Sequence, residues 1–471
     1  MAKSSGPSSP LKLLLVNPSN PLVCITNVKD SRWNRYRVWK PLSLMVLAGL
    51  TPPDWEVSIV DENLGPPNYP DRPRPDLVGI TAFTSQAPRA YEVAAYFRRL
   101  GVPVVLEGIH ATMCLDEART HADAVVTGEA EGVWAKLVED VRQGSLKRQY
   151  DGGLADIGAV PLARHDLLPP AYALGSIQTT RGCPLNCSFC SVTAFNGARY
   201  RMRPIPDVVR EFQAIREKRI LVVDDNLVGT RSDHIARAKD LFRALAQANL
   251  RKEWIAQATI NFADDEELLA LAAKAGCKGV FIGFETPSRE GLEELGKKYN
   301  LLKGREFRAS VRRIQRHNIL VAGSFIIGLD MDQPGIGRRI AEAASEYGVD
   351  NLNVLFLTPL PGTRLWAQMK SQGRLMLDSF PEDWKYYTLT FPVARYKHLS
   401  LDGIIEEMIS CERNFYSFWH ILRRLWGNLC QRRQLFITLA GNLSYRSSLR
   451  LNRKAYANFR RERGNESSRP Q

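Results

Sequence analysis

The chain has 471 residues, of which 44% are hydrophobic and 24% charged, a composition typical of a globular protein that is too long for one ordinary core. No run of about 18 apolar residues occurs, which argues against a membrane span, and eight cysteines in this length argue against a disulfide scaffold. The net charge of +14 leaves contact with nucleic acid or anionic lipid open.

The free thiols favour a reducing compartment, so we expect a cytoplasmic protein. Residues 1–10 are small and polar and lack an apolar segment, and no signal peptide is expected there.

Short apolar segments alternate with helical patterns over residues 10–145. Strands are predicted at residues 11–17, 56–61, 77–83, 102–108 and 123–128, and helices at 41–50, 87–100 and 132–143. This alternation predicts an α/β domain with a Rossmann-like, doubly wound parallel sheet, in which ligands lie beyond the carboxyl ends of the strands. The loops at those ends supply six candidate cofactor-binding residues: Thr84, Ser85, Gly108, His110, Gly128 and Glu129.

Residues 146–175 contain three prolines and no clear periodicity, and they are interpreted as a linker. The alternation resumes over residues 176–365, with six predicted strands, each of the first five followed by a helix, at 176–181, 220–225, 254–260, 279–285, 320–328 and 351–358. Six such units predict a partial (β/α)6 barrel, whose chemistry belongs at the carboxyl ends of its strands.

Three cysteines with the spacing C-x3-C-x2-C follow the first of these strands, namely Cys183, Cys187 and Cys190. Thiolates are the ligands of iron–sulfur clusters, and three of them leave one iron of a [4Fe-4S] cluster open to another ligand. A structural zinc site is the alternative reading. It is disfavoured because such sites usually need four ligands in two pairs, and no second pair lies nearby.

With this motif the chain resembles the radical SAM superfamily. The resemblance implies that the open iron chelates S-adenosylmethionine (SAM), that the cluster cleaves SAM to a 5′-deoxyadenosyl radical, and that Phe189 packs near the adenine. An electron donor such as flavodoxin or ferredoxin is implied as a partner. The family's motifs also point to Asp224, Asp225, Gly283, Glu285 and Gly328 at strand ends as cofactor-binding residues.

The ends of the barrel strands allow further expectations from the residues themselves. Gln257, Thr259 and Asn261 alternate, which predicts one shared face directed toward SAM. Asp224 and Asp225 also suit a capping or turn role, so that reading stays open. Lys297 lies in a predicted helix-to-loop region, and a solvated side chain is the simplest reading of it.

The first half resembles the cobalamin-binding domain that precedes the catalytic domain in one radical SAM class, through residues 15–18, 108–112 and 126–132. The loop at 61–65, where cobalamin domains of the mutase type carry a cobalt-binding histidine, has none, and relatives in the radical SAM class often lack this ligand too. Two readings follow: a domain that binds cobalamin, and a domain that only shapes the site.

Residues 366–460 are predicted to form a mostly helical, basic C-terminal domain. Its aromatic and arginine residues favour a cap over the barrel, with peripheral contact to an anionic membrane as the alternative. A nucleic-acid-binding protein with structural cysteines is the non-enzyme alternative, which the cysteine motif disfavours.

Together these features predict a radical SAM enzyme, a cobalamin-dependent methyltransferase acting on an unactivated carbon of a small-molecule or lipid-like substrate. In the mechanism that the resemblance implies, the adenosyl radical abstracts hydrogen, cobalamin supplies the methyl group, and a second SAM replenishes it. The alternative keeps the radical and drops the methyl donor, which gives carbon–carbon coupling, cyclisation or rearrangement.

Overall fold

The computed structural model describes residues 10–20, 22, 39–301, 306–430 and 435–466. The chain divides into two compact units. The first comprises Met1–Ser176 with the short segments Ala214–Glu217 and Phe380–Lys385, and the second comprises Ile177–Gln213, Lys218–Ser379 and Tyr386–Gln471. Among the described residues, no helix is both long enough and apolar enough to cross a bilayer.

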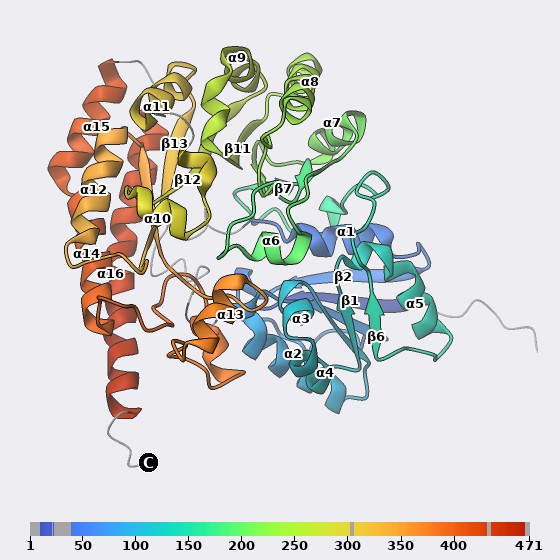
Figure 1. Ribbon diagram of the computed structural model, residues 1–471. Helices are drawn as coiled ribbons and strands as arrows, with labels where there is room; N and C mark the ends of the chain where they lie inside the picture. The colour runs from blue at the N-terminus through green and yellow to red at the C-terminus, as the bar shows by residue number, and fades with distance from the viewer. Residues whose placement is uncertain (1–9, 21, 23–38, 302–305, 431–434, 467–471) are drawn as a thin grey trace, which may run out of the picture. The chain divides into compact units, whose positions relative to one another are not determined.

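The first unit is built on a six-stranded parallel sheet with the order β2-β1-β3-β4-β5-β6 (Figure 1). Its strands are β1 (Leu11–Asn17), β2 (Trp55–Asp61), β3 (Leu77–Thr81), β4 (Val104–Glu107), β5 (Ala124–Thr127) and β6 (Gln149–Asp151). The chain order reverses between β1 and β3, and this switch point is where doubly wound sheets bind ligands. The predicted Rossmann-like fold is confirmed.

Helices cover both faces of this sheet, as a sheet with continuous apolar strands requires. The helices are α1 (Leu42–Leu50), α2 (Ala87–Arg99), α3 (Ile109–Met113), α4 (Leu115–His121) and α5 (Trp134–Arg142). α1 and α5 contact each other on one face, whereas α2, α3 and α4 pack together on the other (Figure 1). Leu13, Leu15, Val105 and Trp134 share the main core of the unit.

The predicted linker begins with a strand of this sheet. β6, at residues 149–151, pairs with β5 and adds a sixth strand to the five that were predicted. Its three residues are too few to show a period-2 pattern, which explains why the sequence did not indicate a strand.

The second unit contains the predicted partial barrel, a parallel sheet with the order β14-β13-β12-β11-β10-β7. Its strands are β7 (Gly175–Ile177), β10 (Arg219–Val222), β11 (Glu253–Ala258), β12 (Cys277–Glu285), β13 (Leu320–Ile327) and β14 (Asn351–Phe356). The helices along the chain are α7 (Ile205–Ala214), α8 (Ser232–Ala248), α9 (Glu266–Lys274), α10 (Arg289–Glu294), α11 (Phe307–Arg316), α12 (Ile336–Tyr347) and α13 (Arg364–Ser371). In Figure 1, α7, α8, α9 and α11 form an arc outside the strands.

A short antiparallel hairpin that was not predicted encloses the cysteine loop. β8 (Thr180–Arg181) pairs with β9 (Arg201–Met202), and the residues between them include helix α6 (Ser191–Asn196). The predicted first strand at 176–181 is therefore split into β7 and β8, which belong to different sheets.

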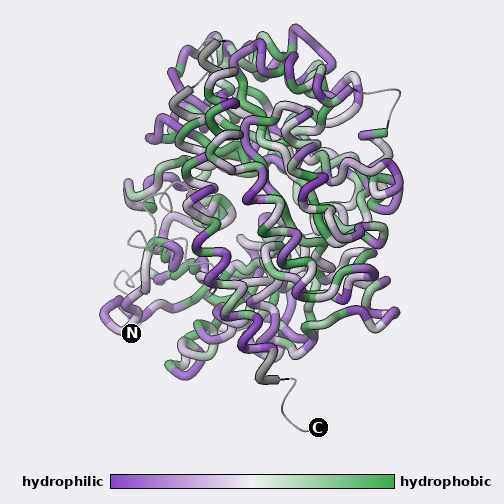
Figure 2. The backbone as a smooth tube through the Cα atoms, turned by 90° about the vertical axis from the view of Figure 1, so that its left-hand side faces the viewer, coloured by the Kyte–Doolittle hydropathy of each residue, from purple (hydrophilic) through white to green (hydrophobic). Residues whose placement is uncertain are grey.

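After α13 the described residues form a 3-10 helix (Glu382–Tyr386) and three α-helices: α14 (Leu401–Phe415), α15 (Phe418–Cys430) and α16 (Leu435–Glu466). α14 packs against α12, and α16 contacts α14, α15 and β14, which confirms the predicted helical C-terminal region. Hydrophilic and hydrophobic residues alternate along the helices in Figure 2, as expected where one face of a helix is buried.

Candidate functional site

The cysteine loop leaves the hairpin at Gly182, whose φ of 84° favours glycine. The Gly182 amide donates to a carboxylate oxygen of Asp225, with an N···O distance of 2.8 Å. Cys187 is buried, whereas Cys183 and Cys190 are partly exposed. The loop is thus tied to the carboxyl end of β10 one residue before the first cysteine.

Asp224, which precedes Asp225 in the sequence, is completely buried and accepts three hydrogen bonds. The Thr179 amide and hydroxyl each lie 2.6 Å from its carboxylate oxygens, and the Thr180 hydroxyl lies 2.9 Å away. Burial nevertheless raises the pKa of Asp224 to about 6. This placement gives Asp224 a structural role: it holds the chain entering the cysteine loop.

The side chain of Asn226 contacts the first cysteine of the loop. Its Nδ2 lies 3.6 Å from the Cys183 sulfur and 3.3 Å from the Thr259 hydroxyl oxygen. Hydrogen bonds to cluster sulfurs are one of the means by which a protein tunes a cluster. Asn226 was recognised in the sequence only as a neighbour of the two aspartates.

The chemistry of the three thiols fits an iron–sulfur cluster. Burial raises the pKa of Cys183, and it raises the pKa of Cys187 to about 12. Negative charge on Cys190 raises both pKa values further, so the three sulfurs lie close enough to interact. No preformed group of three metal-ligating side chains occurs in the described part of the chain. Bound iron would supply the positive charge that buried thiolates need.

The strongest correction to the predicted site concerns Lys297, which is buried rather than solvated. Its ammonium group is ion-paired with Glu285, and the side chains of both residues are about nine-tenths buried. Burial lowers the pKa of Lys297, but the Glu285 carboxylate and Cys187 more than offset this, so the pKa is raised. A Cβ on Gly283 would meet the Lys297 ammonium at 2.9 Å, which explains the glycine.

The strand that was expected to carry Gln257, Thr259 and Asn261 is shorter than predicted. β11 ends at Ala258, and a 3-10 helix spans Ile260–Asp264, so the strand alternation stops before Thr259. Gln257 is exposed, whereas Thr259 and Asn261 are buried. The Thr259 hydroxyl donates to Asn261 at 2.5 Å, and Asn261 donates to the Gly229 carbonyl at 2.9 Å. Of the three side chains, that of Gln257 is the accessible one.

One face of the barrel sheet is partly exposed, and we call it the inner face. The opposite face is covered by helices: Trp254 contacts Phe242 of α8, and Phe284 contacts Phe307 of α11. The exposed or partly exposed residues of the inner face alternate with buried ones along five strands: Leu221, Ile255, Gln257, Phe281, Gly283, Ala322, Ser324, Asn353 and Leu355. Most of these side chains are apolar and three are polar, which suits a pocket for a largely apolar ligand.

Two other predicted residues of this unit have different surroundings. Phe189 is partly exposed in the cysteine loop, so its ring is available to a ligand. Gly328 packs against the Tyr396 ring, where an added Cβ would lie 2.5 Å from a ring carbon. The Gly328 amide donates to Asp332 at 2.8 Å. Gly328 therefore positions the end of β13 rather than presenting a surface.

In the first unit, the carboxyl end of β4 carries two buried polar atoms that lack a hydrogen-bond partner among the described residues. These are Oε1 of Glu107 and Nδ1 of His110. Burial raises the pKa of Glu107 to about 7. Gly108, between them, has a φ of 96°, and an added Cβ would lie 3.0 Å from the Thr81 hydroxyl oxygen. Unsatisfied buried atoms at a strand end of this sheet fit a site that a polar ligand completes.

The other nitrogen of His110 is committed to the protein. Its Nε2 lies 2.9 Å from the Tyr91 hydroxyl and 3.3 Å from a Glu117 oxygen. Trp384 packs edge-on against the His110 ring and donates to Glu117 at 3.0 Å. The ring is thereby fixed in a buried cluster, which no feature of the sequence near His110 indicated.

The remaining predicted residues of this unit lie at the same sheet edge. Thr84 is buried in a 3-10 helix that leads into α2, and the Ser85 carbonyl accepts a bond from Asn20 at 2.7 Å. The Gly128 amide donates to the Thr112 hydroxyl at 3.1 Å. The Glu129 carboxylate accepts from the Ala155 amide at 2.7 Å, so it secures the loop after β6.

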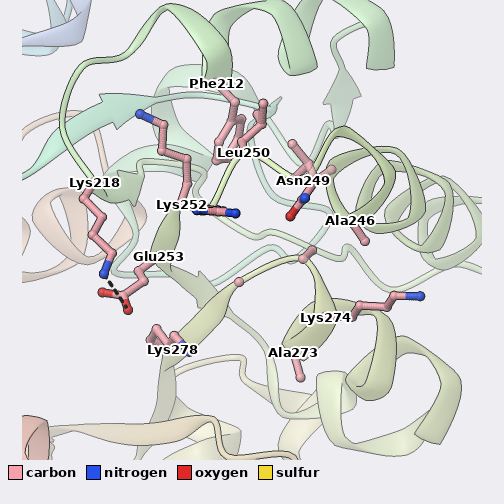
Figure 3. A pocket seen from close by; sticks show the side chains of 14 residues that line it. Phe212, Lys218, Ala246, Asn249, Leu250, Lys252, Glu253, Ala273, Lys274 and Lys278 are labelled. Atoms are coloured by element: carbon pink, nitrogen blue, oxygen red, sulfur yellow. Dashed lines mark ion pairs between the residues drawn. The ribbon is translucent and has the colours of Figure 1, made fainter.

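A separate pocket of about 330 Å³ lies at the amino ends of β11 and β12 and is lined by Lys218, Lys252, Glu253 and Lys274 among others (Figure 3). The cysteine loop follows the carboxyl end of its strand, so this pocket does not belong to the candidate site. Glu253 is paired there with Lys218 at 3.6 Å.

Comparison with known proteins agrees with this geometry. Residues 177–334 match the family model of the Radical SAM superfamily. A bacteriochlorophyllide d C-12(1)-methyltransferase of Chlorobaculum tepidum is 29% identical over 406 residues, which cover 82% of this chain and 85% of that protein. The hopanoid C-2 methylase of Rhodopseudomonas palustris is 28% identical over 350 residues, 72% of this chain and 66% of the relative.

A solved structure shares the fold of both units. The radical SAM methyltransferase TsrM from Kitasatospora setae, solved with cobalamin and a [4Fe-4S] cluster bound, aligns with a TM-score of 0.64 at 18% identity. The alignment covers 94% of this chain and 99% of that chain.

Proposed function

We propose that this chain, which is related to the cobalamin-dependent methyltransferases of the radical SAM superfamily, methylates an unactivated carbon of a lipid-like or tetrapyrrole-like substrate. The observation that carries the proposal is the cysteine loop at the first strand of a six-stranded parallel sheet, in a chain whose first unit is a second, doubly wound sheet.

Cys183, Cys187 and Cys190 would hold a [4Fe-4S] cluster, which with SAM supplies a 5′-deoxyadenosyl radical. The surrounding residues then have distinct tasks. Asp224, Asp225 and Asn226 hold the loop that carries the ligands. Phe189 and Gln257 are predicted SAM-binding residues with accessible side chains, and we assign them to that role.

The carboxyl edge of the first sheet would hold cobalamin, which supplies the methyl group when bound. The unsatisfied atoms of Glu107 and His110 fit the amide groups of such a cofactor, and Thr84 and Ser85 line the same edge. The His110 ring is fixed by Tyr91 and Glu117 through Nε2. Only Nδ1 therefore remains for a ligand.

The inner face supports the substrate class. Leu221, Ile255, Phe281 and Leu355 offer apolar contact, and Gln257, Ser324 and Asn353 offer a few polar groups. Two of the similar proteins are named for methylation of a bacteriochlorophyllide and of a hopanoid, both large polycyclic molecules. We infer a substrate of that size and polarity.

The test is product stoichiometry with anaerobically reconstituted protein, a reductant, and SAM labelled in its methyl group. Hopanoid and tetrapyrrole extracts serve as substrates. Methyl transfer predicts a labelled product and equal amounts of S-adenosylhomocysteine and 5′-deoxyadenosine. Deoxyadenosine and a converted substrate without S-adenosylhomocysteine would instead favour coupling, cyclisation or rearrangement. Absence of both SAM products would contradict the proposal.

A further inference from the structure

One helix of the second unit presents a continuous apolar face to solvent. On α15, Phe418, Trp419, Leu422 and Trp426 are 59%, 75%, 46% and 66% exposed. Positions 418, 422 and 426 are four residues apart, so they lie on one side of the helix. Elsewhere in the described chain, exposed large hydrophobic residues are mostly scattered singly. Leu443 of the neighbouring helix α16 is one of these. A grouped apolar patch marks an interaction surface, whereas scattered ones do not.

The opposite side of α15 fixes the helix in place. Ile421 is buried, and the Arg424 guanidinium donates to Asn442 of α16 at 2.7 Å and to the Phe415 carbonyl at 3.0 Å. The same guanidinium lies 3.9 Å from the centre of the Phe415 ring. Because these contacts determine the rotation of α15, the aromatic side chains cannot turn inward without breaking them.

Positive charge accompanies the apolar face. α15 contains Arg423 and Arg424 and no acidic residue, and α16 contains seven Lys or Arg against two Glu. Arg423 is exposed next to Leu422, and α16, part of which packs against α15, exposes five basic residues along its length: Arg446, Arg450, Arg453, Lys454 and Arg461. Aromatic side chains beside basic ones are the combination that binds the interface of an anionic bilayer.

We propose that α15 is a peripheral membrane-docking helix, which inserts Phe418, Trp419, Leu422 and Trp426 among the headgroups of anionic lipid. The charge of the two helices selects a negative surface, and tryptophan is the side chain most suited to the boundary between headgroup and acyl chain. This inference does not depend on the radical chemistry, but it would bring the enzyme to the location of an apolar substrate.

The test is flotation of the full chain with vesicles. We expect the protein to float with vesicles of phosphatidylcholine and phosphatidylglycerol, to float less with phosphatidylcholine alone, and to be released from the mixed vesicles by salt. The double substitution Trp419→Ser/Trp426→Ser should lower the partition coefficient by at least about tenfold, because each side chain loses apolar burial in the interface.

The matched control is Leu100→Ser, which replaces an exposed apolar residue of the first unit and should leave vesicle binding unchanged. Thermal unfolding verifies that both variants fold. Equal partition of wild type and double variant would overturn the proposal, and so would a failure of the wild type to bind anionic vesicles. A dimer in solution that the double substitution dissociates would also overturn it, since the face would then be a subunit interface.

Discussion

The side-chain amide of Asn226 lies 3.6 Å from the sulfur of Cys183, and it joins the carboxyl end of β10 to the first cysteine of the loop. The same amide contacts the Thr259 hydroxyl after β11. The ends of two neighbouring barrel strands are thus linked to one proposed cluster ligand, through a residue that is itself 1% exposed.

Replacement of Asn226 by leucine removes the donor to Cys183 while filling a similar volume. Loss of a supporting hydrogen bond to a metal ligand typically costs about 10-fold to 100-fold in affinity or activity. We expect deoxyadenosine formation to fall by at least about 10-fold, and the cluster to become harder to reduce. Anaerobic redox titration followed by absorbance checks the second effect. An unchanged potential and rate would show that the contact does not tune the cluster.

Cys187→Ala should abolish cleavage of SAM and lower the bound iron, because two thiolates cannot hold the cluster that three hold. Iron and sulfide analysis of anaerobically reconstituted protein measures the loss. Cys114→Ala is the matched control, since Cys114 is a free thiol of the first unit outside the motif. Equal iron content in the two variants would contradict the assignment of the ligands.

Because Lys297 and Glu285 form a buried ion pair, we expect substitutions of the two residues to have strongly non-additive effects on the free energy of unfolding. Lys297→Met leaves a buried carboxylate without its partner, which costs about 3–5 kcal/mol in comparable cases. The double variant Lys297→Met/Glu285→Gln removes both charges and should recover much of this loss. Urea unfolding of the protein before cluster reconstitution gives the free energy of unfolding of Lys297→Met, Glu285→Gln and the double variant. Additive losses in the double variant would rule out the buried pair.

Glu107 predicts a pH-dependent stability of the first unit. Its pKa is about 7 in the folded chain, against an ordinary value of 4.5 for glutamate, because burial disfavours the charged form. Between those pH values the folded state binds a proton that the unfolded state lacks, so stability is full below pH 4.5 and falls as pH rises toward 7. Above that range the cost is on the order of 3 kcal/mol.

Glu107→Gln removes the titration and keeps the size of the side chain. The variant should match the wild type near the acidic end of this range and exceed it in stability at pH 8, as measured by unfolding midpoints. Glu56→Gln, at an exposed glutamate of β2, controls for loss of one negative charge. A constant difference between Glu107→Gln and wild type at all pH values would refute the assignment.

The parallel sheets were predictable because their strands are apolar runs that alternate with helices, as in residues 11–17 and 320–327. The three cysteines could be proposed as ligands from the sequence because they lie within eight residues of one another. β6 and the hairpin β8–β9 were not predictable, since strands of two or three residues show no periodicity. The pairing of Lys297 with Glu285 depends on a positive φ of 68° at Glu285, which sequence does not reveal.

The inner face was accessible to sequence reasoning but was missed. Its signal is the alternation along β14, where Asn353 and Leu355 are partly exposed and their neighbours are buried. The role of Asp224 could not be assigned from the sequence, because an aspartate that anchors a loop has the same sequence signal as one that binds a ligand. The hydrogen bonds from Thr179 and Thr180 distinguish the two roles.

Trp384 is remote in sequence from the first unit, yet its ring packs on His110 and its indole nitrogen bonds Glu117 in that unit. Phe380 stacks on it, and the Lys385 carbonyl accepts from Asn20. During synthesis the N-terminal sheet would therefore remain incomplete until the ribosome has passed Lys385, with most of the barrel already emerged. A truncated chain ending at Ser176 would leave the Glu117 and His110 side chains uncovered, so expression of that fragment alone would yield a less stable, aggregation-prone product.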